Sequence, residues 1–506
     1  MTASGSVSAA TRAAATGSSG ILLGEPRAWR IATLFVVPYV LLGMAWLGSN
    51  PPVGAPDEDA HLVKALGIAR LDIGVPFAGP VDLTRPADCQ PPPPVDAGDT
   101  QMGTNVGAYP PFPYLPVGLA ASAAATPPQA ITLGRAVILA ETALLLWLAV
   151  WHLVRWLGRR ALLRVVVAVS PMAVFCMAIL NTSGLEIFGA LGVAAVVAVF
   201  LRRPESLSSS ATQAVMLVSG SALILGRQLG LVTMAALVLL LLARGAGPAL
   251  WTEARRGSRM MITTVALLAV ETFAVVAWEL AYDHPALLGP WASPSSLRTF
   301  AGRWFQTATD GVGSFGWLDV VMAGWTTTLW LVAAAVLLLG GLLWGRRPDR
   351  LVIVGMVIAL GIVAYVTYAR VFGPAQSGLQ GRHLLPFFAF LPLFAGIVVA
   401  ERMSPATLGR LLIGLALVLP PVQFYALFLN ATRYAVGLAS EPTWFLPAAR
   451  WSPPLGWPPW LVLGFAACLA MLLGWVQLAR TSPRMTDPDL SPTPLPPVDA
   501  TAVGSP

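Results

Sequence analysis

The chain has 506 residues, of which 56% are hydrophobic and 11% are charged, and its mean hydropathy is +0.72. Because soluble domains are only about 45–50% apolar, this composition excludes a soluble protein and predicts an integral membrane protein. The formal charge of +7 comes from arginine, since Lys64 is the only lysine, and the arginines lie mostly in short connections between apolar runs. This placement indicates membrane topology and excludes a nucleic-acid-binding surface.

Composition divides the chain into three segments. Residues 1–24 are rich in Ala, Ser and Gly, and residues 481–506 are polar and rich in Pro. Neither tail can bury a core, so both are predicted to be disordered and, by the topology below, cytoplasmic. Residues 25–480 form the predicted multi-pass transmembrane domain. The three cysteines are scattered without metal-ligand spacing, which argues against a disulfide framework or a zinc site.

Apolar runs predict an all-α polytopic membrane protein with about twelve transmembrane helices. The runs lie near residues 31–49, 130–154, 161–180, 185–201, 211–226, 229–243, 260–280, 320–344, 351–371, 383–400, 410–429 and 459–479. Arginine-rich connections fall at every second position, at residues 155–160, 202–205, 254–259, 345–350 and 401–410. Since arginine in short loops stays on the cytoplasmic side, both termini are predicted to be cytoplasmic.

The remaining connections are therefore predicted to be external, and the first of them, residues 50–129, is long. Five external segments contain polar residues that are unusual in such an apolar chain. Their sequences are APDEDAH (55–61), NTSGLE (181–186), GRQLG (226–230), DGVGSFGWLD (310–319) and GPAQSGLQGRH (373–383). They place nine candidate site residues at one membrane edge, namely Asp57, Glu58, His61, Asn181, Glu186, Arg227, Asp319, Arg382 and His383. A shared external cleft is the simplest explanation.

Each acidic or histidine position also has a purely structural explanation. The acids at 57–59 suit the first turn of a helix, although ionisable groups at membrane depth are usually functional. His61 lies four residues after Asp57 on the same helix face, so the pair could hold a metal, relay a proton or form a cap contact. For Asn181 and Glu186, capping of the following helix is the simpler explanation.

The two arginines have no acidic neighbour in sequence that would compensate their charge. An unpaired arginine at membrane depth is costly, so Arg227 and Arg382 need a carboxylate or a phosphate as partner. Acids and arginines at an external membrane edge suit a phosphate-bearing lipid. A carboxylate can act as general base on a hydroxyl or hold a divalent metal, and arginines can stabilise the departing phosphate. This chemistry is glycosyl transfer from a polyprenyl phosphate sugar.

Several segments in order resemble a known family. They are PDEDAH (56–61), YPPFPYLP (109–116), SPMAVFCMAILNTSGLE (170–186), FGWLD (315–319) and LQGRHLLPFFAFLPL (379–393). Together they resemble the predicted bacterial membrane proteins of domain of unknown function 2142 over most of residues 31–430. Asp59 and His383 depart from that pattern, which more often has proline and tyrosine there.

That family is itself similar to the GT-C glycosyltransferases, which use lipid-linked sugars and keep a catalytic acid in the first external loop. The resemblance implies that this acid is Asp57 or Glu58. From the residues themselves, His61 is a further catalytic candidate, and the other six candidates are expected to bind substrate. Asp57 is the expected ligand if the reaction uses a divalent metal, Mg or Mn. The lysine-poor composition is similar to that of actinobacterial proteins.

The leading hypothesis is a plasma-membrane glycosyltransferase that moves a sugar from a polyprenyl phosphate donor to a cell-envelope glycan or lipid at the outer face. Its expected partners are membrane lipids, the lipid-linked donor and the acceptor, and no nucleic acid. One alternative is a transporter or flippase of a polar lipid or glycan, which predicts ionisable residues near the middle of several helices. Another is a non-catalytic scaffold that positions other envelope enzymes.

Overall fold

The computed structural model describes residues 25–71, 78–79, 102–103, 106–107, 109–256, 258–281, 294–372, 379–437 and 444–480. The predicted disordered tails, residues 1–24 and 481–506, lie outside the described residues. Much of the predicted first external loop and residues 373–378 also lie outside them.

The described elements are almost entirely helical. In chain order they are α2 (Glu25–Ser49), α3 (Glu58–Ala69), β1 (Ala78–Gly79), β2 (Met102–Gly103), α4 (Tyr114–Ala121), α5 (Pro127–Leu157), η2 (Arg159–Ala161), α6 (Leu162–Ala168), α7 (Pro171–Met177), α8 (Ser183–Phe200), η3 (Pro204–Ser208), α9 (Ser210–Gly226), α10 (Gln228–Ala243), α11 (Gly247–Arg255), α12 (Arg259–Ala281), α13 (Pro294–Gly313), β3 (Ser314–Phe315), β4 (Val320–Val321), α14 (Gly324–Trp344), α15 (Arg347–Val366), η5 (Thr367–Phe372), η6 (Gly381–Leu384), α16 (Leu385–Arg402), α17 (Pro405–Val436), η7 (Leu446–Ala448) and α18 (Trp457–Arg480).

Among the described residues, nine helices are long and apolar enough to cross a membrane, and two bent pairs, α6–α7 and α10–α11, would raise the number to eleven. The apolar helix α9 has 17 residues and is shorter than the other spans. Together these twelve units correspond one to one with the twelve apolar runs of the sequence. The prediction of an all-α polytopic membrane protein is therefore confirmed, and its count of twelve includes two bent units and one short one.

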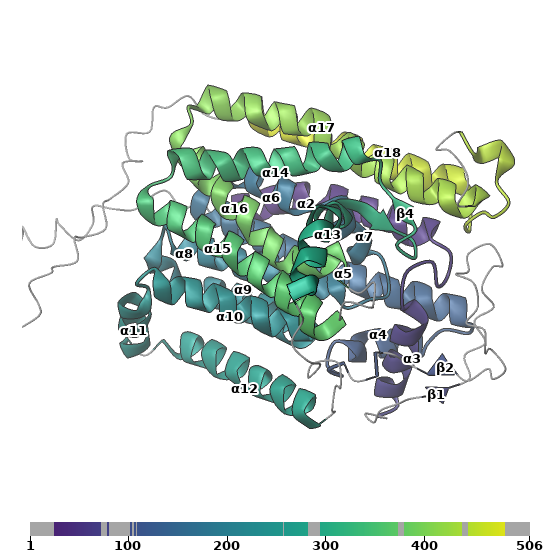
Figure 1. Cartoon of the computed structure of the whole chain (residues 1–506), viewed down its shortest axis with the longest axis horizontal. Helices are drawn as coiled ribbons and strands as arrows, with labels where there is room; N and C mark the ends of the chain where they lie inside the picture. The colour runs from purple at the N-terminus through teal and green to yellow at the C-terminus, as the bar shows by residue number, and fades with distance from the viewer. Residues whose placement is uncertain are drawn as a thin grey trace, which may run out of the picture.

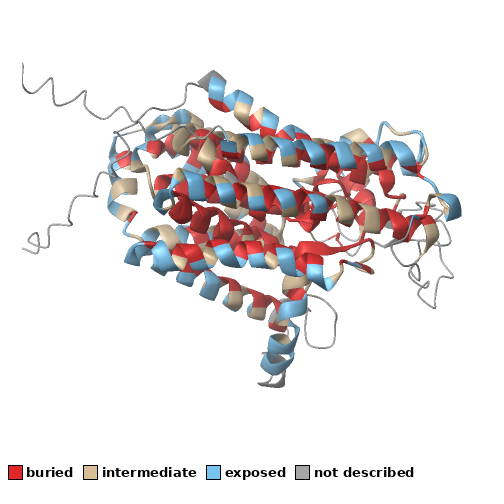
Figure 2. Cartoon of the chain, turned by 90° about the horizontal axis from the view of Figure 1, so that it is seen from above, coloured by how far each residue is buried: buried red, intermediate tan, exposed pale blue. Residues whose placement is uncertain are grey.

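The outer helices present apolar side chains to their surroundings, as expected of lipid-facing surfaces. On α12, for example, Phe273 is 74% exposed and Leu280 is 81% exposed. The interior is formed by α8, which is buried along its whole length, and by α16, which packs against it. Figure 2 shows this division, with buried ribbon inside the bundle and exposed ribbon on the outer helices.

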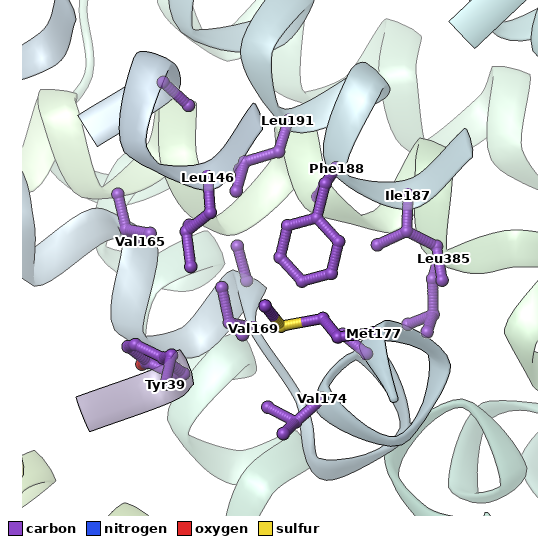
Figure 3. Close-up of a cluster of buried hydrophobic side chains, with 14 of the residues drawn as sticks. Tyr39, Leu146, Val165, Val169, Val174, Met177, Ile187, Phe188, Leu191 and Leu385 are labelled. Atoms are coloured by element: carbon purple, nitrogen blue, oxygen red, sulfur yellow. The ribbon is translucent and has the colours of Figure 1, made fainter. Parts of the chain in front are cut away.

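Lipid tails are as apolar as the side chains, so moving an apolar side chain from lipid into the protein gains little free energy. The central helices are therefore held together mainly by close van der Waals packing. Figure 3 shows Phe188 of α8 among Leu146 of α5 and Met177 of α7. The helix α8 approaches α9 through glycine, since a Cβ on Gly192 would lie 2.1 Å from the Ser219 hydroxyl. Any larger residue at this position would force the two helices apart.

Short elements gather at one end of the bundle. Figure 1 shows α3 and α4 at this end, with β4 of the β3–β4 hairpin nearby, while α11 lies at the opposite end. The hairpin pairs Phe315 with Val320 in antiparallel register. The indole of Trp317, between its strands, donates to the carbonyl of Val53 at 2.9 Å. The hairpin therefore supports the segment that leads into α3, where the acidic residues lie.

Candidate functional site

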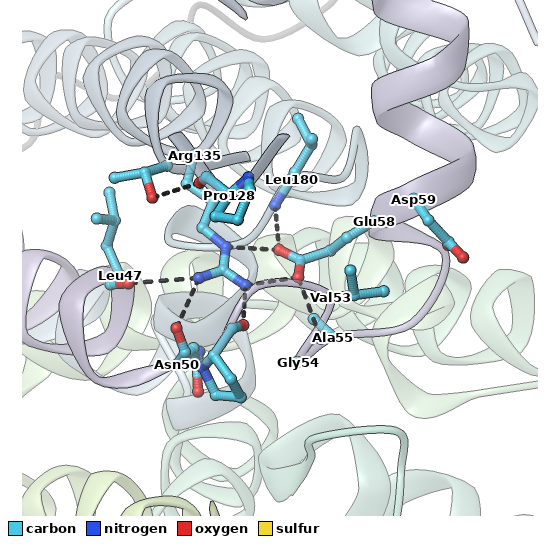
Figure 4. Close-up of polar contacts among 12 residues, drawn as sticks. Leu47, Asn50, Val53, Gly54, Ala55, Glu58, Asp59, Pro128, Arg135 and Leu180 are labelled. Carbon is cyan, nitrogen blue, oxygen red and sulfur yellow. Dashed lines mark hydrogen bonds and ion pairs between the residues drawn. The ribbon is translucent and has the colours of Figure 1, made fainter. Parts of the chain in front are cut away.

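Glu58 is a buried carboxylate at the start of α3, and its charge is balanced by Arg135 of α5. The Arg135 guanidinium donates to it from Nε at 2.7 Å and from Nη2 at 2.5 Å, and neither side chain is more than 2% exposed. The backbone N–H groups of Ala55 and Leu180 also donate to Glu58, at 3.2 and 3.0 Å. Figure 4 shows how these four donors surround the two carboxylate oxygens.

Arg135 also closes the end of α2. Its Nη1 donates to the carbonyl of Asn50 at 2.9 Å, and its Nη2 donates to the carbonyl of Pro51 at 2.7 Å. Helix ends leave such carbonyls without intrahelical partners, so a buried guanidinium satisfies several of them at once. The Glu58–Arg135 pair thus joins α2, α3, α5 and the segment before α8. Its geometry is that of a structural ion pair, because both side chains are buried and four donors occupy the Glu58 oxygens.

Asp57 directly precedes Glu58 and has a different environment. It is the N-terminal flanking residue of α3, with a left-handed backbone at φ 63°, and its side chain makes no capping hydrogen bond. Its carboxylate is 33% exposed and lies 3.9 Å from Nη2 of Arg382. Aspartate tolerates the left-handed region better than most residues, and such conformations cluster at functional sites. The capping explanation for this acid has no hydrogen bond to support it.

Arg382 reaches the cluster from η6, at the start of α16. The preceding Gly381 packs so closely on α13 that a Cβ there would lie 2.0 Å from the backbone nitrogen of Gly311. The Arg382 side chain is 3% exposed, and its Nε and Nη1 have no hydrogen-bond partner among the described residues. Two buried guanidinium donors are therefore available to an incoming anion.

Arg227 lies at the break between α9 and α10, where the backbone is extended. It donates to the hydroxyl of Tyr109 at 3.0 Å and to that of Ser183 at 3.3 Å, and its guanidinium lies 5.3 Å from the Tyr109 ring centroid. Both hydroxyl partners are neutral, so they orient the guanidinium without compensating its charge. Glu186 is close enough to interact with it electrostatically.

His61 lies one turn after Asp57 on α3 and pairs with a tyrosine of α4. Its Nδ1 is 2.8 Å from the hydroxyl of Tyr114, and the two rings stack with centroids 5.7 Å apart. Burial lowers the pKa of His61 to about 3, Asp57 opposes this shift, and Arg227 and Arg382 reinforce it. Burial also raises the pKa of the Tyr114 phenol well above its usual value. Both groups are thus neutral at physiological pH.

Glu186 lies in the first turn of α8 and is completely buried. Neither of its carboxylate oxygens has a hydrogen-bond partner among the described residues, while Arg227 acts on it electrostatically. Asn181, just before this helix, accepts from the backbone N–H of Ser183 at 2.6 Å. Asn181 therefore stabilises the turn before α8. The two Glu186 oxygens can still accept hydrogen bonds from a ligand.

The structure brings six of the nine candidate residues into one electrostatic cluster, hereafter the Asp57 cluster. Its members are Asp57, His61, Glu186, Arg227, Arg382 and His383. Three candidates lie elsewhere. Glu58 is engaged with Arg135, Asn181 shapes its own turn, and Asp319 pairs with Arg433 at 2.9 Å beside the hairpin. His383 accepts from the backbone N–H of Gln380 at 3.4 Å and helps to close η6.

Sequence reasoning missed Arg135, Tyr109 and Tyr114. Arg135 had a detectable signal, because it lies inside the apolar run 130–154, where a charged residue requires a partner. The two tyrosines lie in the segment YPPFPYLP, which contributed to the family resemblance. Nothing in that segment reveals that their hydroxyls meet Arg227 and His61, because these contacts join positions 118 and 53 residues apart.

The described donors around Asp57 do not form a set that fits the predicted divalent metal, which stays a prediction. Magnesium and similar hard cations need several oxygen ligands, usually more than one carboxylate. Asp57 faces the guanidinium of Arg382, and the adjacent Glu58 is consumed by Arg135. Within the described ranges, no group of three or more His, Cys, Asp and Glu side chains is placed to hold a metal ion. Among the described residues, the cations beside Asp57 are arginines.

Comparison with known proteins gives one family and one solved structure. A family model described as a predicted membrane protein (DUF2142) matches residues 88–391, more than half of the chain. No match is found among curated proteins. The chain is similar to the crystal structure of ArnT from Cupriavidus metallidurans in the apo state, with 16% sequence identity and a TM-score of 0.45. That similarity covers 89% of this chain and 77% of the ArnT chain.

Proposed function

The chain belongs to the DUF2142 family of predicted membrane proteins, and we propose that it is a GT-C-like glycosyltransferase. In this proposal it transfers a sugar from a polyprenyl phosphate donor to a glycan or lipid acceptor of the cell envelope. The observation that supports the proposal most directly is Arg382. Its buried guanidinium has two donors without a hydrogen-bond partner among the described residues, and its Nη2 lies 3.9 Å from a partly exposed carboxylate, Asp57.

Asp57 is the proposed general base. A carboxylate can accept the proton of an acceptor hydroxyl as its oxygen attacks the anomeric carbon of the donor sugar. The bond between that carbon and the phosphate oxygen then breaks, and the electron pair leaves with the polyprenyl phosphate. The 33% exposure of the Asp57 side chain leaves room for a hydroxyl to approach. The buried Glu58 is not assigned this role, because four hydrogen bonds occupy its oxygens.

The arginines are the proposed phosphate-binding groups. A guanidinium can donate two parallel hydrogen bonds to phosphate, and preorganised donors stabilise the negative charge that develops on a leaving phosphate. Arg382 supplies its Nε and Nη1, and Arg227 supplies charge from a position held by Tyr109 and Ser183. Glu186, whose two oxygens have no hydrogen-bond partner within the described segments, can accept from hydroxyl groups of the bound sugar. No step uses a metal ion.

The site is proposed to lie at the outer face of the plasma membrane, with both chain termini in the cytoplasm. The arginine pattern of the connections supports this orientation. The N-terminal ends of α8 and α16 approach the Asp57 cluster, whereas arginine-rich connections follow the C-terminal ends of both helices. An external site is consistent with cell-envelope assembly, where lipid-linked donors present their sugars outside.

Transfer by the purified protein tests the proposal. The full chain in lipid nanodiscs is incubated with radiolabelled polyprenyl phosphate sugars and with lipid or glycan acceptors, and labelled product is separated from donor. We expect label to move from at least one donor to an acceptor, with release of polyprenyl phosphate. Movement of intact donor across liposome membranes without covalent change would instead support the flippase alternative. Absence of both binding and turnover for every donor would overturn the proposal.

A further inference from the structure

A second group of arginines lies at the opposite ends of α8 and α16 from the Asp57 cluster. Arg202 lies two residues after the end of α8, Glu401 lies in the last turn of α16, and Asp349 lies in the first turn of α15. Because α8 has 18 residues, each rising about 1.5 Å, the two groups are separated by roughly 27 Å. The second group is therefore independent of the proposed glycosyl transfer.

Arg202 uses both nearby carboxylates. Its Nε donates to Glu401 at 2.9 Å, its Nη1 donates to Asp349 at 2.9 Å, and its guanidinium lies 5.2 Å from the Phe394 ring centroid. These contacts join the end of α8 to α15 and α16. The third nitrogen, Nη2, is buried and has no hydrogen-bond partner among the described residues. Both acids thus hydrogen-bond to Arg202.

Arg164 of α6 is the residue that remains uncompensated. It is 4% exposed, and its Nε and Nη1 have no hydrogen-bond partner in the part of the chain that the structure describes. A Cβ on Gly396 would lie 2.8 Å from Cγ of Arg164, so the stem of this side chain runs against α16. Arg202 and Glu401 both act on its guanidinium electrostatically, which places it beside the Arg202 ion pairs.

Arg244, at the end of α10, adds a further donor. Its Nε is buried without a partner among the described residues, and Asp349 and Arg202 act on it electrostatically. The Arg164 cluster is therefore defined by three arginines, Arg164, Arg202 and Arg244, and two acids, Asp349 and Glu401. Three positive and two negative charges leave one positive charge. Arg164 is the deeply buried member, and a buried charge without a hydrogen-bonded partner is destabilising, so the cluster has the charge and the donors for one monoanion.

The surroundings favour a lipid headgroup as that anion. The cluster lies where α8 and α16 end and α15 begins, at a boundary of the apolar spans. Nearby residues of the same connections include the exposed arginines Arg346, Arg347, Arg350 and Arg402. Basic pockets between transmembrane helices bind anionic phospholipid headgroups, and guanidinium groups suit phosphate geometry. We propose that the Arg164 cluster binds the phosphodiester of an anionic membrane lipid.

Lipid-dependent stability of the purified full-length chain tests this proposal. Unfolding temperature in detergent is measured while short-chain phosphatidylglycerol, phosphatidylcholine or inorganic phosphate is added, and bound lipid is counted by native mass spectrometry. Phosphatidylglycerol should stabilise saturably, whereas phosphatidylcholine should not, because its own cation balances its phosphate. Equal stabilisation by both lipids would overturn the proposal. Full stabilisation by inorganic phosphate alone would assign the site to free phosphate instead of lipid.

Variants locate the binding site. Charge-assisted hydrogen bonds to phosphate account for about tenfold or more in affinity, so Arg164→Gln should weaken phosphatidylglycerol binding by that factor. Arg410→Gln, an exposed arginine at the start of α17, is the matched control and should leave affinity unchanged. If Arg164→Gln does not fold, Arg244→Gln removes a half-buried donor of the same cluster and should weaken binding less. Unchanged lipid affinity in the folded cluster variants would overturn the proposal.

Discussion

Asp57 and Glu58 are adjacent acids that face two different arginines. Glu58 accepts two hydrogen bonds of 2.5 and 2.7 Å from Arg135, and two backbone N–H groups donate to the same carboxylate. Asp57 is 3.9 Å from Arg382, whose Nε and Nη1 have no partner among the described residues. One pair is closed and buried, whereas the other is open and partly exposed.

The difference teaches that buried charge at a membrane edge has two uses. A closed pair satisfies all its hydrogen bonds and orders the helices around it, but it has nothing left to bind substrate. An open pair costs stability in the absence of a ligand, because its donors were taken out of water without replacement. In the proposed function, the phosphate of the lipid-linked donor completes this pair. The following predictions separate the two pairs experimentally.

The largest expected effect is on turnover, from Asp57→Asn. Asparagine also tolerates the left-handed backbone at φ 63° and nearly matches aspartate in shape, but it cannot accept the acceptor's proton. Transfer should fall by roughly 10²–10⁴-fold, the usual contribution of a general base, while the unfolding temperature should fall far less than in Glu58→Gln, because the Asp57–Arg382 pair is longer and partly exposed. Asp59→Asn is the matched control, since Figure 4 shows Asp59 pointing away from the Glu58–Arg135 pair. Equal losses in both variants would contradict the assignment of Asp57.

The second effect is on stability, from Glu58→Gln. This change leaves the Arg135 charge buried and uncompensated, which typically costs about 3–5 kcal/mol. Thermal unfolding in detergent and the amount of protein in the membrane should both decrease. The double variant Glu58→Leu/Arg135→Met should recover only part of the loss, because the carbonyls of Asn50 and Pro51 then lack their donors. Normal stability with loss of transfer alone would make Glu58 a catalytic residue instead.

The third effect is on donor affinity, from Arg382→Lys. Lysine keeps the charge but cannot donate two parallel hydrogen bonds, so one charge-assisted bond worth about 1.5–3 kcal/mol is lost. The Kd for a polyprenyl phosphate sugar should rise about tenfold or more. Arg227→Lys should have a smaller effect on Kd, because two of that guanidinium's donors already serve Tyr109 and Ser183. Reduced stability at unchanged Kd in both variants would indicate purely structural arginines.

The smallest effect is a pH dependence of stability caused by His61. Its pKa is about 3 in the folded chain, because burial disfavours the charged ring, and about 6.5 when unfolded. Between these values the unfolded state binds a proton that the folded state does not, so stability is present above about pH 6.5 and decreases as the pH falls. One such group accounts for about 2 kcal/mol between pH 7 and pH 5. Plots of unfolding free energy against pH for wild type and His61→Gln should therefore diverge over this range. Parallel plots would show that folding does not lower the pKa of His61.

Much of the fold could be predicted because its signals are local. Each apolar run of the sequence corresponds to a helical unit, since a span needs about 20 apolar residues wherever it lies in the chain. The bent pairs α6–α7 and α10–α11 could not be predicted in this way, because composition does not show a bend. The apolar run at residues 211–226 predicts a full span, but the helix that forms there, α9, has only 17 residues.

Less of the candidate site could be predicted. The sequence by itself determined which polar residues interrupt the apolar runs, because hydropathy and residue type are properties of each position alone. Only the tertiary structure decided how these residues are paired. Arg135 of α5 reaches Glu58 rather than Asp57, 77 residues away along the chain, and Arg382 arrives beside Asp57 because η6 packs against α13. Ion pairing depends on distance and burial, and both are set by helix packing across the whole chain.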